Sequence, residues 1–276
     1  MTQTHSSALL AWRHYPAGEH GFYRAPVLIA GPTEAVLIDG GFTYSDGRAV
    51  AEAIKATGKR LTLIYVSQSD PDYYFSLGPI KAAFPEARVI AASQTVAAIR
   101  GNAEKKLAIW GPQLKDNGPQ TLADVVIPEA FDGKTLAVDG ETIEIVDAEG
   151  LPNRRYLWVP SLRAVFGGVL IFSGVHVWTA DTAGADQRAA WRANLDVIAA
   201  RKPAIVVAGH MTSTAVADAS GIDHTRAWLL AFEEELATAG DSAALTAAMK
   251  ARFPNLGMEV AIDIGAKVAT GEIKWG

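Results

Sequence analysis

Four polar or ionisable side chains directly follow one buried strand. This strand is predicted over Leu61–Ser67, where β-branched and aromatic residues form a continuous apolar run. An amide, two carboxylates and a phenol come next, namely Gln68, Asp70, Asp72 and Tyr73. Loops that leave the carboxyl end of a buried strand can aim their side chains into one crevice. The residue types and their spacing therefore indicate acid–base chemistry or a metal site at this strand end.

A pair of carboxylates can divide the roles of acid and base. If Asp70 and Asp72 converge, repulsion between like charges raises the apparent pKa of the pair, so that one carboxyl holds a proton while the other accepts one. Tyr73 and the distant His210 would then orient or protonate the substrate. The alternative is structural, because Asp70-Pro71-Asp72 is also a common turn at the start of a helix. Both interpretations remain open at this stage.

His210 is the second functional signal. An apolar run over residues 204–208, predicted to be a buried strand, ends in Gly209-His210 and follows an amphipathic helix predicted over residues 185–200. Histidine is the side chain best suited to proton transfer or metal binding near neutral pH. A lone histidine after a strand is more often structural, so this pattern by itself leaves both a structural role and a site role open for His210.

Several further side chains are candidates for the substrate pocket. Alternation along the strand-like segment 175–178 places His176 and Trp178 on one face, and we predict that they line the pocket together with Gln68 and Tyr74. For His176 a hydrogen-bonded structural role is equally open. The polar loop 115–122 is predicted to border the cleft, and Trp110 lies in a helix predicted to break near Gly111-Pro112.

The strand, loop and helix around Asp72 resemble the signature of the metallo-β-lactamase superfamily, in which a hydrophobic strand ends in Thr-His-x-His-x-Asp-His. Gln68 and Asp70 stand where the family has its first two histidines, Tyr73 stands where it has the last, and Asp72 matches. His210 stands where the family has its final metal histidine, and the resemblance implies that it faces the same site as Asp72.

Three further stretches can be compared with the family pattern. Asp39-Gly40-Gly41 is similar to the family's Leu-Ile-Asp-x-Gly, which implies that Asp39 lies behind the metal site, although Asp before two glycines also forms ordinary turns. Glu149 stands near the position of a third histidine, as a substitute ligand or a solvated loop carboxylate. The family's bridging carboxylate is missing at Gly167-Gly168-Val169.

The resemblance implies a fold of the α/β (α+β) class, a four-layer αββα sandwich of two mixed β-sheets flanked by helices, formed by one domain over residues 1–276. Predicted hairpins over residues 134–146 and 156–166 would begin the second sheet. Two helices are predicted within residues 223–253, and residues 258–275 are predicted to form an edge strand or a docking segment.

The remaining ligands are too few for two zinc ions. One divalent ion, zinc, manganese or iron, held by Asp72, His210 and Asp70 remains open, and so does a site without any metal. The first functional hypothesis is a hydrolase-like enzyme that acts on a small ester, lactone, amide or thioester. The alternatives are a small-molecule-binding protein that has lost catalysis, and a metal-independent isomerase or lyase that uses Asp70, Asp72 and His210.

Composition excludes several other classes. The chain of 276 residues has 25 Lys and Arg against 30 Asp and Glu and no cysteine, so thiolate zinc sites and a cysteine nucleophile are excluded. No basic run typical of nucleic-acid binding occurs, and no apolar run approaches the roughly 20 residues of a transmembrane helix. The N-terminal segment lacks the features of a secretory signal, which predicts a cytoplasmic protein whose partner is a small molecule. The oligomeric state stays open.

Overall fold

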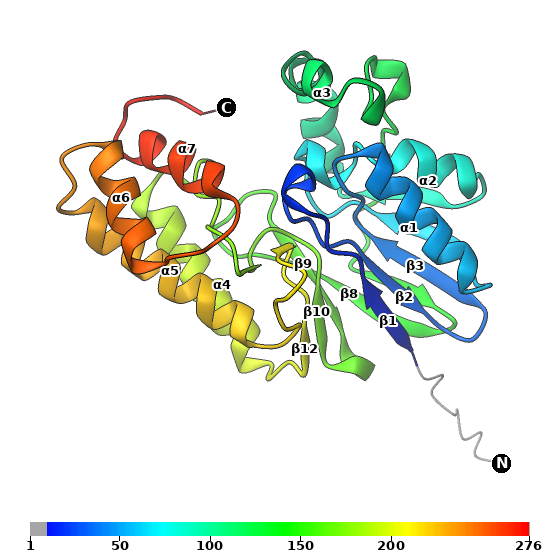
Figure 1. Cartoon of the computed structure of the whole chain (residues 1–276). Coiled ribbons are helices and arrows are strands. Elements are labelled where there is room, and N and C mark those ends of the chain that lie inside the picture. Colours follow the sequence, from blue (N-terminus) through cyan, green and yellow to red (C-terminus); the bar gives the residue numbers. More distant parts are fainter. Residues whose placement is uncertain (1–9, 276) are drawn as a thin grey trace.

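Two β-sheets pack against each other between two groups of helices in the computed structural model, which describes residues 10–275 (Figure 1). The larger sheet has six strands in chain order: β1 (Ala11–His14), β2 (Val27–Ala30), β3 (Glu34–Ile38), β4 (Arg60–Tyr65), β5 (Arg88–Ala91) and β6 (Glu129–Ala130). Strands β1 to β3 are antiparallel, and β3 to β6 are parallel. The predicted αββα sandwich of mixed sheets is confirmed.

The second sheet has five strands in the order β12 (Ile205–Val206), β10 (Ala164–Phe166), β9 (Arg155–Val159), β8 (Glu141–Asp147) and β7 (Thr135–Val138). Two short strands, β11 (Phe172–Ser173) and β13 (His210–Met211), form a separate parallel pair. In the sequence β11 follows β10, and β13 follows β12. The helices beside the first sheet are α1 (Tyr44–Ala56), α2 (Leu77–Ala83) and α3 (Ser93–Leu114). Those beside the second are α4 (Ala185–Ala200), α5 (Ser220–Leu236), α6 (Ser242–Arg252) and α7 (Glu259–Ala269).

Burial explains why the central strands form. All four residues of β2 are buried, and in β3 and β4 the side chains of Val36, Leu37 and Ile64 have no exposed surface. Such strands are apolar on both faces because helices cover one face of the sheet and the second sheet covers the other. The strand ends therefore carry the polar groups, and those ends meet on the side of the molecule where α3 and α7 lie (Figure 1).

Three details differ from the sequence predictions. Residues 258–275 form no edge strand; Val260, Ile262, Ile264 and their neighbours form α7, whose buried positions follow helical spacing and which packs on α6. Helix α3 does not break at Gly111-Pro112 but continues to Leu114 with Pro112 in its last turn. Residues 175–178 form no regular strand. Part of the N-terminal segment interpreted above, residues 1–9, lies outside the described residues.

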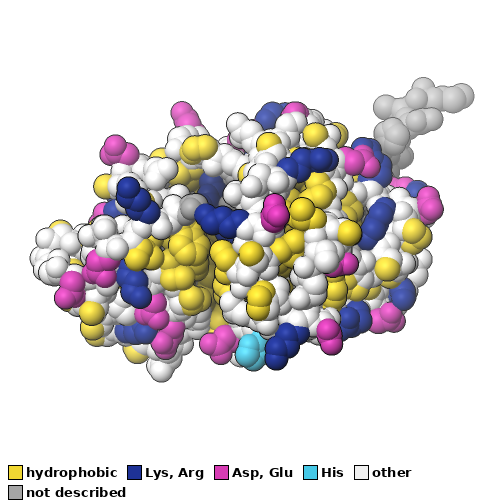
Figure 2. Space-filling model, turned by 90° about the horizontal axis from the view of Figure 1, so that it is seen from above, with side chains coloured by type: hydrophobic (Ala, Val, Ile, Leu, Met, Phe, Trp, Pro, Cys, Tyr) yellow, Lys and Arg dark blue, Asp and Glu magenta, His cyan; other side chains and the backbone are white. Residues whose placement is uncertain are grey.

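Within residues 10–275, no helix is both long enough and apolar enough to cross a membrane. Figure 2 shows acidic and basic side chains interspersed over the face on which α3 and α7 lie, with a hollow near its middle that is partly lined by hydrophobic side chains. The mixture of charges on this face is unlike the single-sign field of a nucleic-acid interface.

One carboxylate ties the hairpin turns of the two sheets together. Asp139, in the turn between β7 and β8, accepts hydrogen bonds at Oδ2 from the backbone N–H groups of Thr33 and Glu34, both at 2.8 Å, and at Oδ1 from the Thr33 hydroxyl. Asp139 has a φ of 47°, which asparagine also tolerates. We expect Asp139→Asn to lower the midpoint of thermal unfolding, because asparagine keeps only one accepting oxygen and its NH2 group cannot accept the bonds made at the other carboxylate oxygen. Circular dichroism melts would show this, with Asp116→Asn at an exposed site as the control; equal melting of both variants would contradict the prediction.

Candidate functional site

The structure brings the ends of two distant segments together. The loop after β4 and the short 3-10 helix Pro71–Tyr73 carry Asp72 and Tyr73, and β13 carries His210. Nε2 of His210 lies 3.5 Å from Oδ2 of Asp72 and 3.5 Å from the Tyr73 hydroxyl. These three predicted site residues therefore share one site.

A buried arginine lies among them. The side chain of Arg24 has no exposed surface, and its Nη1 donates to the Gly209 carbonyl while Nη2 donates to Oδ2 of Asp39 at 3.2 Å. Its Nε is 3.8 Å from Oδ2 of Asp72, and its Cζ lies 3.5 Å from the ring centroid of Tyr73. The guanidinium thus supplies a fixed positive charge to the two carboxylates and stacks on the phenol.

Local backbone conformation explains how Arg24 reaches this position. Phe22 and Tyr23 have φ values of 54° and 55°, so the chain turns sharply just before Arg24. Gly209 lies directly opposite, and a Cβ there would come within 2.1 Å of the Gly168 carbonyl and 3.1 Å of Arg24 Nη1. Gly209 is therefore required for the close approach of Arg24, and His210 follows it as the first residue of β13.

Asp39 holds Arg24 from behind. Its carboxylate accepts hydrogen bonds from the backbone N–H of Ser67 at 2.6 Å and from the Ser67 hydroxyl at 2.7 Å, besides the Arg24 bond. The side chain is buried, and its φ of 63° belongs to the turn predicted from Asp39-Gly40-Gly41. Asp39 therefore positions other groups and does not face a substrate.

His210 is held as a neutral imidazole. Its Nδ1–H donates to the Phe22 carbonyl at 2.7 Å, which leaves a lone pair on Nε2 facing Asp72 and Tyr73. Burial, with the nearby Arg24 charge, lowers the pKa of His210 to about 3. The Tyr73 hydroxyl donates to the Gly168 carbonyl at 3.0 Å, and burial raises the pKa of Tyr73 well above its usual range. Neither ring changes its charge near neutral pH.

Asp72 is the group that titrates. Burial raises the pKa of Asp72 to about 7, with Arg24 opposing the shift and Asp70 adding to it. Its side chain keeps 13% exposure, against 0% for Arg24. Asp72 is therefore a carboxyl that can gain or lose a proton at neutral pH and is open to a bound molecule.

Asp72 opens into a small apolar cavity of about 70 Å³. Its wall is mostly aromatic and aliphatic, with Asp70, Asp72, Tyr73, His210 and Lys106 as the polar groups; the apolar lining includes Phe22, Phe42, Trp110, Val169, Trp178, Met258 and Trp275. Trp110 lies edge-on to Phe22 and Phe42, with ring centroids 5.3 and 5.4 Å away, so it packs and lines the cavity at once. The cavity volume lies below the roughly 300–1,000 Å³ of a typical ligand pocket, so this cavity has room for a small apolar part of a ligand.

These residues do not fit a resident divalent metal ion. Within residues 10–275, no three His, Asp or Glu side chains are grouped so as to hold one. The guanidinium of Arg24 lies beside Asp72 and Asp39, where its charge opposes a second cation. Asp70 contacts Gln68 and Lys106 instead of His210, with Nε2 of Gln68 at 3.2 Å and Nζ of Lys106 at 4.0 Å. The predicted metal set of Asp70, Asp72 and His210 stays a prediction, and the local charges are against it.

The remaining predicted pocket residues lie in different parts of the structure. Trp178 lines the apolar cavity, and Gln68 lines a second, polar cavity with Asp70. His176 lies in the core, where its Nδ1 accepts a hydrogen bond of 3.1 Å from Nε1 of Trp228, because the segment around it has no strand alternation. Its predicted place beside Trp178 is therefore not observed.

Two other predicted positions, Tyr74 and Glu149, line neither cavity. Tyr74 is buried against Phe75, with the two ring centroids 5.2 Å apart. Glu149 is exposed, and only its backbone is bonded, to Asn194.

Sequence reasoning missed Arg24 and Lys106. Arg24 carried one usable signal, since it is the one charged residue in the otherwise apolar stretch Phe22–Ile29. A charge in such a place needs a buried partner. Lys106 carried none, because it is one of several charged residues on a long helix.

Comparisons with known proteins agree with this fold. A sequence profile of the metallo-β-lactamase superfamily matches residues 22–210. This chain therefore belongs to the metallo-β-lactamase superfamily. Comparison with curated protein sequences found no match.

Solved structures show the same architecture. A metallo-β-lactamase family protein from Thermus thermophilus aligns with a TM-score of 0.62 at 16% identity, covering 95% of this chain and 91% of that one. A metallo-β-lactamase from Pontibacter korlensis aligns with a TM-score of 0.58 at 20% identity, covering 82% of this chain and 96% of that one. At these identities the likeness concerns the fold and not the activity.

Proposed function

We propose that this protein is a metal-independent, hydrolase-like enzyme that acts on a small ester, lactone, amide or thioester. The observation that carries the proposal is the position of Arg24, whose guanidinium supplies the positive charge beside Asp39 and Asp72. In the superfamily a metal ion provides such a charge and acidifies water. Here the chain's own arginine provides the charge, and it cannot activate water, so a base must do so.

Asp72 is that base. Its carboxylate takes a proton from a water molecule while the water oxygen bonds to the substrate's carbonyl carbon and the carbonyl electron pair moves to oxygen. Lys106 lines the same cavity, and its ammonium group would face the negative oxygen that forms. When the intermediate collapses, the bond to the leaving oxygen, nitrogen or sulfur breaks, and Asp72 returns the proton to the leaving group.

The neighbours of Asp72 have positioning roles in this scheme. His210 presents the lone pair of Nε2 to the protonated carboxyl, and Arg24 faces the ionised form. His210 and Tyr73 keep their charges fixed near neutral pH, whereas burial raises the pKa of both Asp72 and Asp70, so these two carboxyls set the protonation state of the site. The aromatic wall excludes bulk water, which strengthens these interactions.

Metal independence is directly testable. We expect protein purified without chelator to contain far less than one equivalent of zinc, manganese or iron by elemental analysis. We also expect its turnover on a panel of small esters, lactones, amides and thioesters to be unchanged by EDTA or by added metal. One equivalent of metal together with loss of turnover in EDTA would contradict the proposal.

The same panel separates the alternatives. A binding protein would be stabilised thermally by a panel compound and would form no product. An isomerase or lyase would convert a compound without incorporating oxygen from ¹⁸O-labelled water, whereas hydrolysis places that label in the acid product. We expect the label in the product.

A further inference from the structure

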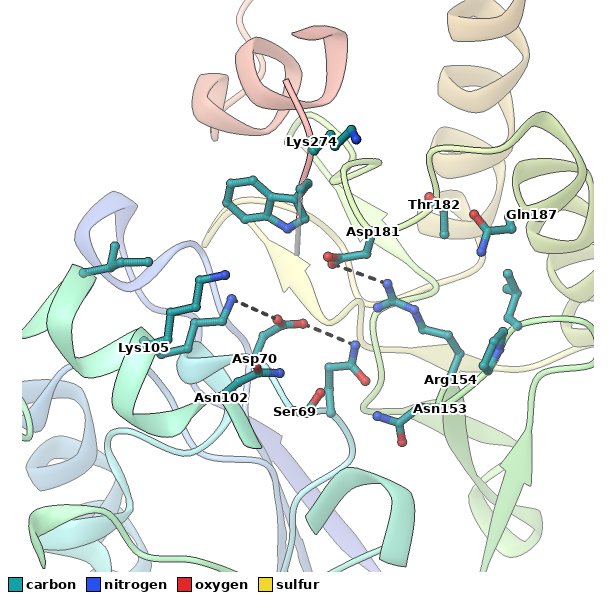
Figure 3. Close-up of a pocket in the computed structure, with 16 residues that line it drawn as sticks. Ser69, Asp70, Asn102, Lys105, Asn153, Arg154, Asp181, Thr182, Gln187 and Lys274 are labelled. Atoms are coloured by element: carbon teal, nitrogen blue, oxygen red, sulfur yellow. Dashed lines mark hydrogen bonds and ion pairs between the residues drawn. The ribbon is translucent and has the colours of Figure 1, made fainter. Parts of the chain in front are cut away.

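A second cavity of about 440 Å³ adjoins the apolar one (Figure 3). The two cavities share Asp70, Lys106 and Trp275 in their walls. The second cavity is built from four parts of the chain: the loop after β4, helix α3, the turn between β8 and β9, and the segment before α4, with the C-terminal residues closing one side. A molecule that reaches Asp72 from the apolar cavity can therefore extend into this one.

Positive charge predominates among the residues that line the second cavity. Four cationic side chains line it, against the two carboxylates of Asp70 and Asp181; the cations are Lys105, Lys106, Arg154 and Lys274. In Figure 3 the side chains of Arg154, Asp181 and Asp70 point toward one another across the centre of the cavity. An anionic group of a ligand would meet a local excess of positive charge there.

Arg154 has a buried donor with no partner. Only 9% of the residue is exposed, and Nη2 lies 3.5 Å from Oδ2 of Asp181, but Nη1 is buried and makes no hydrogen bond. A buried guanidinium N–H without an acceptor costs free energy that a ligand oxygen would recover. Asp181 is itself held by Nε1 of Trp178 at 3.0 Å, so the arginine is fixed in place.

Gln68 offers the complementary group. Its Nε2 donates to Oδ2 of Asp70 at 3.2 Å, while its Oε1 is buried without any hydrogen bond. The cavity therefore has one unsatisfied donor on a cation and one unsatisfied acceptor on an amide. A ligand that carries an anionic oxygen and a nearby hydroxyl or N–H satisfies both.

We propose that the second cavity binds an anionic oxygen group of the substrate, a carboxylate or a phosphate, through Arg154, while the apolar body of the substrate occupies the cavity at Asp72. That this ligand is a substrate rests on the proposed function, but the binding of the anion does not depend on catalysis. The planar fork of arginine matches the oxygen pair of either anion. Lys106 lies between the two cavities, where it can face both the anion and the reacting carbonyl.

Calorimetric titration of the intact protein tests this inference with defined probes. Phenylacetate carries a carboxylate and phenyl phosphate a phosphate, and phenylacetamide is a neutral match of similar shape. We expect one or both anions to bind at least tenfold more tightly than phenylacetamide. Whichever anion binds more tightly identifies the source of the oxygen group.

Substitution of Arg154 then locates the site. Arg154→Gln should weaken anion binding by about tenfold or more, in line with the loss of one charged hydrogen bond. Arg154→Lys keeps the charge and loses the planar fork, so its anion affinity should lie between those of the parent and of Arg154→Gln. It provides the test if the glutamine variant does not fold. Arg88→Gln, at an exposed ion pair with Glu129, makes the same change of charge and should bind as the parent does.

Anions that bind no better than phenylacetamide, or an unchanged affinity in the Arg154 variants, would overturn the inference. Because no turnover is measured, this failure would leave the hydrolytic proposal standing. Conversely, an inactive protein that still binds the anions through Arg154 would contradict the hydrolytic proposal alone.

Discussion

Asp72→Asn is expected to abolish turnover and, at pH 8, to raise the free energy of unfolding. The loss of a general base lowers rates by about 10²- to 10⁴-fold. The stability effect follows from the pKa of Asp72, which is about 7 in the folded protein against an ordinary value of 3.8. Because the fold favours the protonated form, stability is highest below the ordinary pKa and decreases as the pH rises through 7. A neutral amide removes this penalty, which is at most about 4 kcal/mol.

Urea denaturation at pH 5 and pH 8 measures the second effect. The difference between the variant and its parent should grow from pH 5 to pH 8, and the parent's kcat/KM should rise with pH through a midpoint near 7. Asp196→Asn, the same chemical change at an exposed residue, should alter neither quantity. A variant that stays active, or one that is equally destabilised at both pH values, would contradict the assignment of Asp72 as the base.

Arg24→Met is expected to cost about 3–5 kcal/mol of folding free energy, since it leaves the buried Asp39 carboxylate without its cation. Methionine roughly preserves the length of the arginine stem, so most of the loss reports charge and hydrogen bonding. The double variant Arg24→Met with Asp39→Asn should recover part of the loss, because the fully buried Asp39 carboxylate is then replaced by a neutral amide and only Asp72 has lost its cation. The coupling between the two sites is measured by a double-mutant cycle.

An exposed arginine provides the matched control. Arg88→Met removes a surface ion pair with Glu129 and should cost less than about 1 kcal/mol. If Arg24→Met is as mild as Arg88→Met, the guanidinium is not the charge that holds the site together. If the double variant is no more stable than Arg24→Met, Asp39 is not its principal partner.

The sequence predicted the parts of this fold in which a local pattern and its environment agree. The apolar run before Gln68 forms β4, and the run over residues 204–208 forms only the short β12, after which His210 begins β13. Both patterns are local. The family signature adds the expectation that the two segments lie at the same site. Asp72 and His210 could therefore be placed near each other without coordinates.

Other parts depend on contacts that no local pattern contains. Arg24 is buried because Asp39, Gly209 and Tyr73 converge on it from separate segments. His176 lies in the core because Trp228, on a helix far along the chain, donates to it. In residues 258–275 the apolar positions suit a strand as well as a helix, and packing on α6 selects the helix.

The most direct measurement is a crystal structure of protein soaked with zinc, with anomalous scattering recorded above and below the zinc absorption edge. We predict density for the Arg24 guanidinium beside Asp39 and Asp72 and no anomalous peak within bonding distance of Asp72 or His210. An anomalous peak bridging Asp72 and His210, with the Arg24 side chain turned away, would contradict it.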